Sequence, residues 1–185
     1  MNPSLAGRIA GALFLAAFLF YGGGMALSDK TIGVLLILAN SVAVTAIGVL
    51  FFGPLRPAAP RTARAYLAAR VAEGTLLAVG VAFLAGGNPE VNSYLYAAAM
   101  VLLAAGSIPM CLTLGRLRWI PQWLAIWGAV GYGLLAVGTV LGFAAPDAAL
   151  VLAAPGGLFE ITFGVFLLRM GLPSRGPTPA MNAAE

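Results

Sequence analysis

The stretch Ala68-Ala69-Arg70-Val71-Ala72-Glu73-Gly74-Thr75 places an arginine and a glutamate inside an otherwise apolar segment that is long enough to span a membrane. A charged side chain at bilayer depth costs roughly 2.5–3.5 kcal/mol on insertion scales. Proteins keep such residues where they pair with one another or perform a function. Arg70 and Glu73 are three positions apart, so they share one face of a helix. The stretch therefore predicts a membrane protein whose other helices surround this face.

The composition excludes an ordinary soluble domain. Hydrophobic residues make up 61% of the chain, charged residues 9%, and the mean hydropathy is +0.98, whereas soluble domains contain about 25% charged residues. We therefore expect membrane lipid to surround the protein. With one cysteine and no histidine, we expect no metal site and no cofactor. We also expect no nucleic-acid partner, because the basic residues form no run with interleaved aromatic residues.

Six apolar segments are long enough to cross a bilayer. We predict helices over residues 8–27, 31–52, 64–84, 93–114, 122–143 and 148–170. The fold class is therefore an all-α membrane protein, with one six-helix transmembrane bundle over residues 1–172. Residues 173–185 contain three prolines among small residues and are predicted to form a disordered cytoplasmic tail.

The basic residues predict the orientation of the bundle. One end of the predicted helices carries Arg8, Arg56, Arg61, Arg64, Arg116, Arg118, Arg169 and Arg175. The other end carries Lys30 alone together with the acids Asp29, Glu90 and Asp147. The end rich in Lys and Arg faces the cytoplasm, and six spans bring both termini to that end. We therefore predict that the N- and C-termini are cytoplasmic.

Three further polar residues fall near the middle of the bilayer. At a rise of 1.5 Å per residue, Glu73 lies about 13 Å and Glu160 about 15 Å from the cytoplasmic edge. Asn40 lies near the middle of its helix, and such groups face the bundle interior. One arginine and two glutamates leave one acid unpaired if all three share a site. An apolar site favours the neutral form of such an acid, and Glu160 is the candidate.

Three functions fit this polar centre. The first is a site for an apolar or isoprenoid-like ligand, with acid–base chemistry as its catalytic form: a proton-initiated cyclase or isomerase. In that enzyme Glu160 donates the proton, Glu73 is the base or orients the reaction, and Arg70 keeps Glu73 ionised. The second function is a small proton-coupled transporter in which Glu160 carries the proton. The third is a non-catalytic structural or accessory subunit, in which Arg70 and Glu73 fix helix register and Asn40 links helices.

Aromatic residues are the candidate walls of the ligand site. Tyr66 precedes Arg70 by one turn, so its hydroxyl reaches the same cluster. Trp123 and Trp127 are four residues apart and share a face. One interpretation is that they belong to an interfacial aromatic belt or to a packing contact. The other is that they line a cavity, and Trp127 is the deeper of the two. Tyr96 is expected in the belt at the opposite membrane edge.

Glycine and proline allow alternative interpretations. Pro155-Gly156-Gly157 either forms a break that lipid-embedded helices tolerate or makes room beside Glu160. Glycines at helical spacing suit close helix contact. That contact occurs either within one chain or between the chains of a homo-oligomer.

Together these motifs resemble a known family. They are Arg8-Ile9-Ala10-Gly11, Asn40, Tyr66 with Arg70-Val71-Ala72-Glu73, Arg118 with Pro121-Gln122-Trp123-Leu124-Ala125-Ile126-Trp127-Gly128, and Phe159-Glu160. In this order, over about residues 7 to 171, they resemble the bacterial multi-pass membrane proteins of the domain of unknown function 4386 family. The resemblance implies a six-helix bundle in the bacterial cell (inner) membrane. It implies no catalytic roles.

Overall fold

The computed structural model describes residues 2–173, and these form six α-helices without any strand. The helices are α1 (Pro3–Ala26), α2 (Thr31–Leu55), α3 (Pro60–Ala85), α4 (Pro89–Arg116), α5 (Gln122–Leu141) and α6 (Pro146–Met170). All six are long and apolar enough to cross a membrane. The chain is thus an all-helical protein of the multi-pass membrane type. The tail predicted for residues 173–185 lies outside the described residues, apart from Pro173.

Four helices begin earlier than their predicted starts at residues 8, 64, 93 and 148. Their first residues are Pro3, Pro60, Pro89 and Pro146. Proline is favoured in the first helical turn because the N–H that it lacks has no partner there. The predicted helices began after these prolines, whereas each of the four prolines starts a helix. In α1 the preceding Asn2 also caps the helix, since its side chain accepts a hydrogen bond from the Ser4 amide at 3.0 Å.

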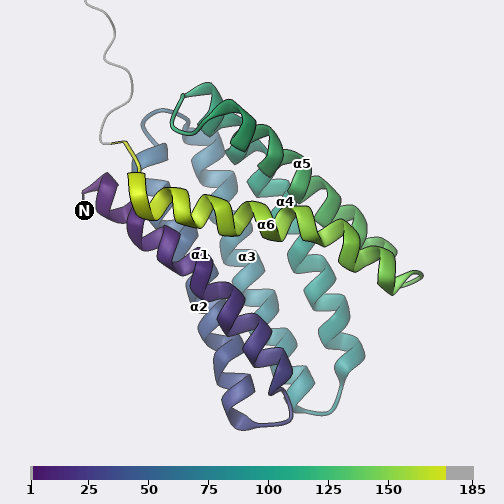
Figure 1. Cartoon of the computed structure of the whole chain (residues 1–185). Coiled ribbons are helices and arrows are strands. Elements are labelled where there is room, and N and C mark those ends of the chain that lie inside the picture. Colours follow the sequence, from purple (N-terminus) through teal and green to yellow (C-terminus); the bar gives the residue numbers. More distant parts are fainter. Residues whose placement is uncertain (1, 174–185) are drawn as a thin grey trace, which may run out of the picture.

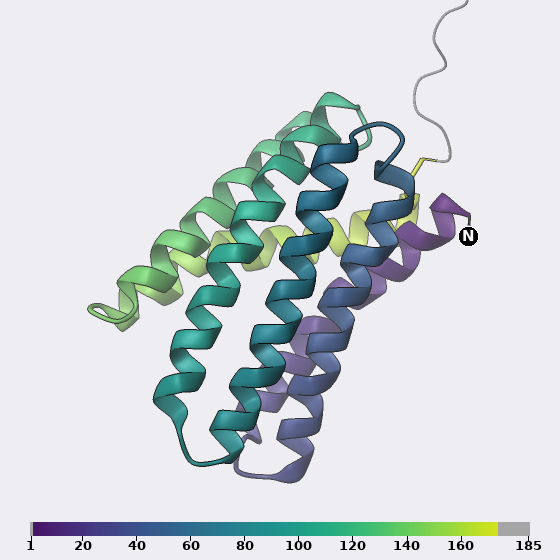
Figure 2. The ribbon, with the colours of Figure 1, turned by 180° about the vertical axis from the view of Figure 1, so that it is seen from behind.

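The six helices form a closed ring. Each helix packs against its neighbours in chain order, and α6 packs against α1. No other pair of these helices comes into backbone contact. Helices α1, α6 and α5 lie in front in Figure 1, with α6 crossing the front, and α2, α3 and α4 lie side by side in Figure 2. Side chains from all six helices therefore meet in the interior.

The interior is packed most densely toward one end. We call the end that carries Arg8, Arg56, Arg64, Arg116 and Arg169 the Arg-rich end. Side chains that are almost fully buried fill the ring there: Phe14, Phe51, Leu55, Tyr66, Leu114, Phe163 and Leu167. These side chains fill the half of the interior that lies nearer the Arg-rich end. The polar centre of Arg70, Glu73 and Glu160 lies at the boundary of this packed half.

Candidate functional site

A cavity of about 350 Å³ occupies the other half of the ring. Residues from all six helices line it, and most of them are apolar. On α6 the lining runs from Glu160 to Leu150, which corresponds to about 15 Å of helix. Its polar side chains are Tyr21, Asn40, Arg70, Glu73, Tyr96 and Glu160. The cavity is therefore an elongated apolar space that ends on a charged cluster.

Arg70 is the centre of that cluster and is 1% exposed. Its Nη1 donates to Glu73 Oε2 at 3.0 Å, and its Nε donates to the Tyr66 hydroxyl at 3.0 Å. Its Nη2 lies 3.7 Å from Glu160 Oε1. The guanidinium carbon lies 5.2 Å from the ring centroid of Phe14 and 5.3 Å from that of Tyr66, within cation–π range. One cation thus holds two carboxyl groups that are far apart in the sequence.

Glu160 is the more accessible of the two acids. Its side chain is 19% exposed, against 3% for that of Glu73. The Tyr132 hydroxyl donates to Glu160 Oε1 at 2.7 Å. Sequence reasoning missed Tyr132, although a phenol in the middle of an apolar helix signals a buried hydrogen-bond partner. A hydrogen bond from Tyr132 of α5 therefore holds the Glu160 side chain in place, while its carboxyl group remains accessible from the cavity.

Two polar groups that line the cavity lack a complete set of partners. Asn40 Oδ1 and Arg70 Nη2 are buried and have no hydrogen-bond partner in the part of the chain that the structure describes. Ser107 Oγ is a third such atom, but Ser107 is not among the residues that line this cavity. Buried polar groups are nearly always hydrogen-bonded, so unpaired ones call for a reason. At Asn40 and Arg70, a polar molecule held in the cavity, ordered water included, would supply such partners.

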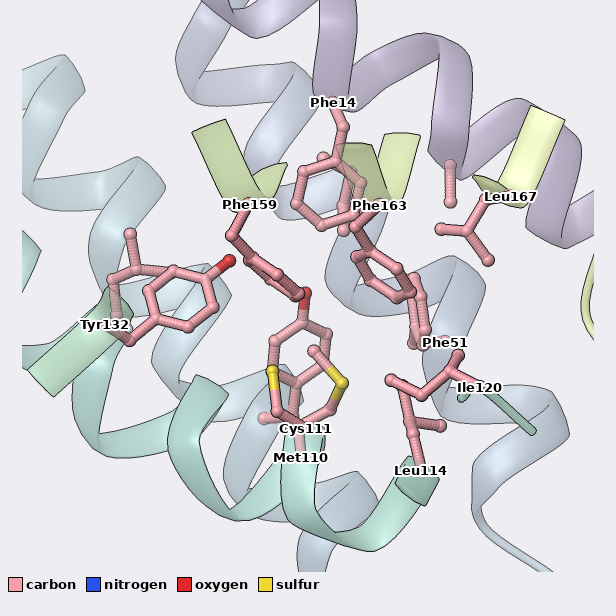
Figure 3. Close-up of a cluster of buried hydrophobic side chains, with 14 of the residues drawn as sticks. Phe14, Phe51, Met110, Cys111, Leu114, Ile120, Tyr132, Phe159, Phe163 and Leu167 are labelled. Atoms are coloured by element: carbon pink, nitrogen blue, oxygen red, sulfur yellow. The ribbon is translucent and has the colours of Figure 1, made fainter. Parts of the chain in front are cut away.

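Aromatic packing seals the cavity on the side of the Arg-rich end. Figure 3 shows Phe14, Phe159 and Phe163 grouped together, with Tyr132 beside Phe159. The ring centroids of Phe14 and Phe163 are 5.5 Å apart, and those of Phe159 and Phe163 are 5.3 Å apart. These rings form a solid floor beneath the charged cluster.

The cavity opens sideways between α1 and α6. These helices approach closely at Gly11 and Gly164, where a Cβ on Gly11 would lie 2.5 Å from the Gly164 carbonyl oxygen. From there the two helices diverge toward the C-terminal end of α1 and the N-terminal end of α6 (Figure 1). Exposed residues on both helices line this opening: Phe18, Gly22, Leu150 and Ala154. The opening lies on the flank of the bundle, the surface that acyl chains contact in a membrane.

A second hollow, of about 530 Å³, adjoins the cavity away from the Arg-rich end. The two share five lining residues: Tyr21, Tyr96, Leu135, Leu150 and Ala153. The rings of Tyr21 and Tyr96 stack at 5.4 Å between centroids. Tyr96 was expected in a membrane-edge belt, and this expectation is wrong because its ring turns inward against Tyr21 and lines both spaces.

The two tryptophans lie apart from the charged cluster. Trp127 donates its Nε1 hydrogen to the Pro155 carbonyl at 3.1 Å and packs edge-on against Phe159. Trp123 is 59% exposed and stacks on Trp127. Neither tryptophan lines the cavity. Tyr66 contacts Arg70 from the packed half and is likewise absent from the lining.

Both interpretations of Pro155-Gly156-Gly157 have a structural counterpart. The α6 helix runs without interruption through Pro155, so the chain tolerates the proline there, and the Pro155 carbonyl accepts a hydrogen bond from Trp127 of α5. Gly156 contacts Gly131 on α5, where an added Cβ on Gly131 would lie 3.0 Å from the Gly156 Cα. Gly157 lines the cavity one turn from Glu160. The segment therefore allows close helix packing and also leaves space beside the acid.

No group of three or more His, Cys, Asp or Glu side chains within residues 2–173 is placed to hold a metal ion. The single cysteine, Cys111, is buried among hydrophobic residues. The polar side chains at the site are one guanidinium, two carboxyls, one amide and the phenols around them.

The sequence and structure were compared with curated proteins, with solved structures and with models of protein families. No curated protein and no solved structure matches the chain. One family model matches residues 88–171, which include α4, α5 and α6 and thus Tyr132 and Glu160. Arg70 and Glu73 lie outside the matched residues. The match confirms the resemblance found in the sequence: residues 88–171 match the model of the family described as domain of unknown function (DUF4386).

Proposed function

We propose that the protein binds an apolar molecule with a single polar end inside the membrane. The observation that carries this proposal is the elongated apolar cavity that ends on Arg70, Glu73 and Glu160 and opens sideways between α1 and α6. Ligand sites are typically apolar with a few precisely placed polar groups. An isoprenoid or other lipid fits this combination. It would enter from the bilayer and bring its polar end to the cluster.

The membrane in which this occurs is proposed to be a bacterial cell membrane, with both termini cytoplasmic. The excess of arginine at one end of the bundle supports this orientation. The cavity would then open to the outer half of the bilayer, while the packed half faces the cytoplasm.

The test of ligand binding is to identify what purifies with the protein. Mass spectrometry of protein extracted in a mild detergent should find a small apolar molecule in near-stoichiometric amount. Ala154→Trp places a bulky side chain at the opening and should deplete this molecule at least about ten-fold. Val151→Trp is the control, because Val151 is 71% exposed on the same helix and does not line the cavity. Equal lipid content in both variants and the native protein would refute the proposal.

Acid–base chemistry on the bound molecule is the second candidate, and the position of Glu160 favours it. Glu160 would give a proton to a carbon–carbon double bond, forming a C–H bond and a carbocation. Aromatic rings such as Phe14, Tyr21 and Tyr96 line the cavity and would stabilise that cation. Loss of a proton from a neighbouring carbon to Glu73 or back to Glu160 would restore a double bond, so isomerisation or cyclisation needs no co-reactant.

Product analysis tests this chemistry. Membranes that contain the protein should convert an added polyunsaturated isoprenoid into an isomer of equal mass. Glu160→Gln should reduce the rate at least about 100-fold while the binding of the isoprenoid persists. An unchanged rate in Glu160→Gln would leave binding as the function and remove the catalytic candidate.

A further inference from the structure

We infer that the polar end of the ligand is an uncharged hydroxyl group, as in a long-chain or isoprenoid alcohol or a phenol. This inference rests on the proposed binding function and specifies its ligand. It follows from the hydrogen-bonding atoms left unpaired in the cavity, the balance of charge around them, and the shape of the apolar space beyond them.

The two unpaired atoms belong to residues that line the cavity, and they are one donor and one acceptor. Arg70 Nη2 can only donate, and at 3.7 Å its contact with Glu160 Oε1 is too long for a hydrogen bond. Asn40 Oδ1 can only accept. Arg70 is 1% exposed and Asn40 4%, so bulk water does not supply their partners. A hydroxyl is the smallest group that matches both kinds of atom, because its oxygen can accept from a donor such as Arg70 Nη2 and its hydrogen can donate to an acceptor such as Asn40 Oδ1.

The charges around these atoms disfavour an ionised head group. A carboxylate or phosphate that approaches Arg70 Nη2 also approaches the Glu73 carboxylate, which already pairs with Nη1 of the same guanidinium at 3.0 Å and balances its charge. An ammonium group would meet the guanidinium of Arg70 itself. In a cavity that excludes bulk water, such like-charge contacts are strongly unfavourable. An uncharged head group avoids both.

The apolar space accommodates the rest of such a molecule. The lining extends from Glu160 to Leu150 on α6, over about 15 Å. It then meets the second hollow past the stacked rings of Tyr21 and Tyr96. A flexible chain with its hydroxyl at Arg70 would lie along these walls, and its end would reach the opening beside Leu150.

A set of matched C20 isoprenoids tests the inference. The probes are geranylgeraniol, its methyl ether, the corresponding carboxylic acid, the corresponding amine and the hydrocarbon without a head group. Each competes against a tritiated, photoreactive geranylgeraniol for the protein in lipid nanodiscs. The alcohol should compete at least about ten-fold better than any other member, including the ether, which accepts but cannot donate. Equal competition by all members would overturn the inference and leave the proposed binding function intact.

Two variants test whether Asn40 accepts the hydrogen bond that the ligand hydroxyl donates. Asn40→Leu keeps a similar volume but removes the acceptor, so the preference for alcohol over ether should disappear. Ser107→Ala is the matched control: its hydroxyl is also buried and unpaired but lies outside the lining, so the preference should persist. If Asn40→Leu retains the preference, the assignment of the hydroxyl contact is refuted. If the photoreactive alcohol fails to bind the native protein at all, the inference fails, while a different co-purifying molecule would still uphold the proposed function.

Discussion

The guanidinium of Arg70 is enclosed by two aromatic rings and two carboxyl groups. Breaking a buried ion pair by removing one partner costs more than the pair contributes, because the remaining charge is left uncompensated. At Arg70 the charge left without its partner would be that of Glu73, which pairs with Arg70 at 3.0 Å. The stability of the interior should therefore depend strongly on this side chain.

Arg70→Met should lower the free energy of unfolding by roughly 3–5 kcal/mol. The measurement is unfolding of the purified protein in mixed micelles by added denaturing detergent, followed by circular dichroism. Arg61→Met is the control, because Arg61 is exposed on the same helix and should change the value by less than about 0.5 kcal/mol. Equal effects of the two substitutions would show that the cluster does not depend on Arg70.

Tyr132→Phe should destabilise the protein by roughly 1–3 kcal/mol, because the Glu160 carboxyl group loses its phenolic hydrogen-bond donor. The same unfolding assay measures this change. Tyr94→Phe provides the comparison, since Tyr94 is 62% exposed and its hydroxyl makes no hydrogen bond within the described residues. A loss no larger than that of Tyr94→Phe would contradict the role given to Tyr132.

At the scale of helices, Gly48 on α2 decides how closely α3 approaches. A Cβ added at Gly48 would lie 2.7 Å from Arg70 Cβ and 3.3 Å from Arg70 Cγ. Both contacts involve the base of the arginine side chain, which cannot move without shifting α3. The missing side chain of Gly48 therefore leaves the space that Arg70 occupies.

Gly48→Ala should consequently destabilise the protein by about 1–3 kcal/mol and weaken ligand binding, because it displaces Arg70. Gly53→Ala in the same helix has open space around the new Cβ and should be neutral or slightly stabilising. Detergent unfolding and ligand content of the two purified variants measure both effects. A Gly48→Ala protein that matches Gly53→Ala in both would refute this steric argument.

The number of helices was predictable because apolar segments of spanning length are a strong signal. The starts of α1, α3, α4 and α6 were not, because proline favours both a loop and the first turn of a helix. Arg70 and Glu73 could be paired from their spacing alone. Their contact with Glu160 could not, since equal depth in two helices does not determine which faces meet. Tyr132 was overlooked for the same reason: its partner lies 28 residues away on another helix.

The whole molecule is a ring with one packed half and one hollow half. All six helices of a single chain contribute to the cavity lining. The aromatic floor beneath Arg70 separates the cavity from the Arg-rich end, which favours a ligand site over a proton path through the centre of the bundle.

The proposed orientation makes a prediction at this scale. In a chain with Cys111→Ala, a membrane-impermeant maleimide added to intact bacterial cells should label Asp29→Cys but not Ala58→Cys. Both positions are exposed in turns at opposite ends of the bundle. Permeabilised cells provide the control, since both cysteines should then react. The reverse pattern in intact cells would place the Arg-rich end outside.

The most direct test of the central claim is to map where a membrane-dissolved ligand resides. Geranylgeraniol with a photoreactive group at its apolar end is incorporated into nanodiscs with the protein, activated by light, and located by mass spectrometry of peptides. The account predicts labels at cavity residues near the opening, such as Phe18, Tyr21 and Leu150, and their loss in Ala154→Trp. Labels spread evenly over exposed residues outside the lining, such as Val42 and Val137, and unchanged in Ala154→Trp, would contradict it.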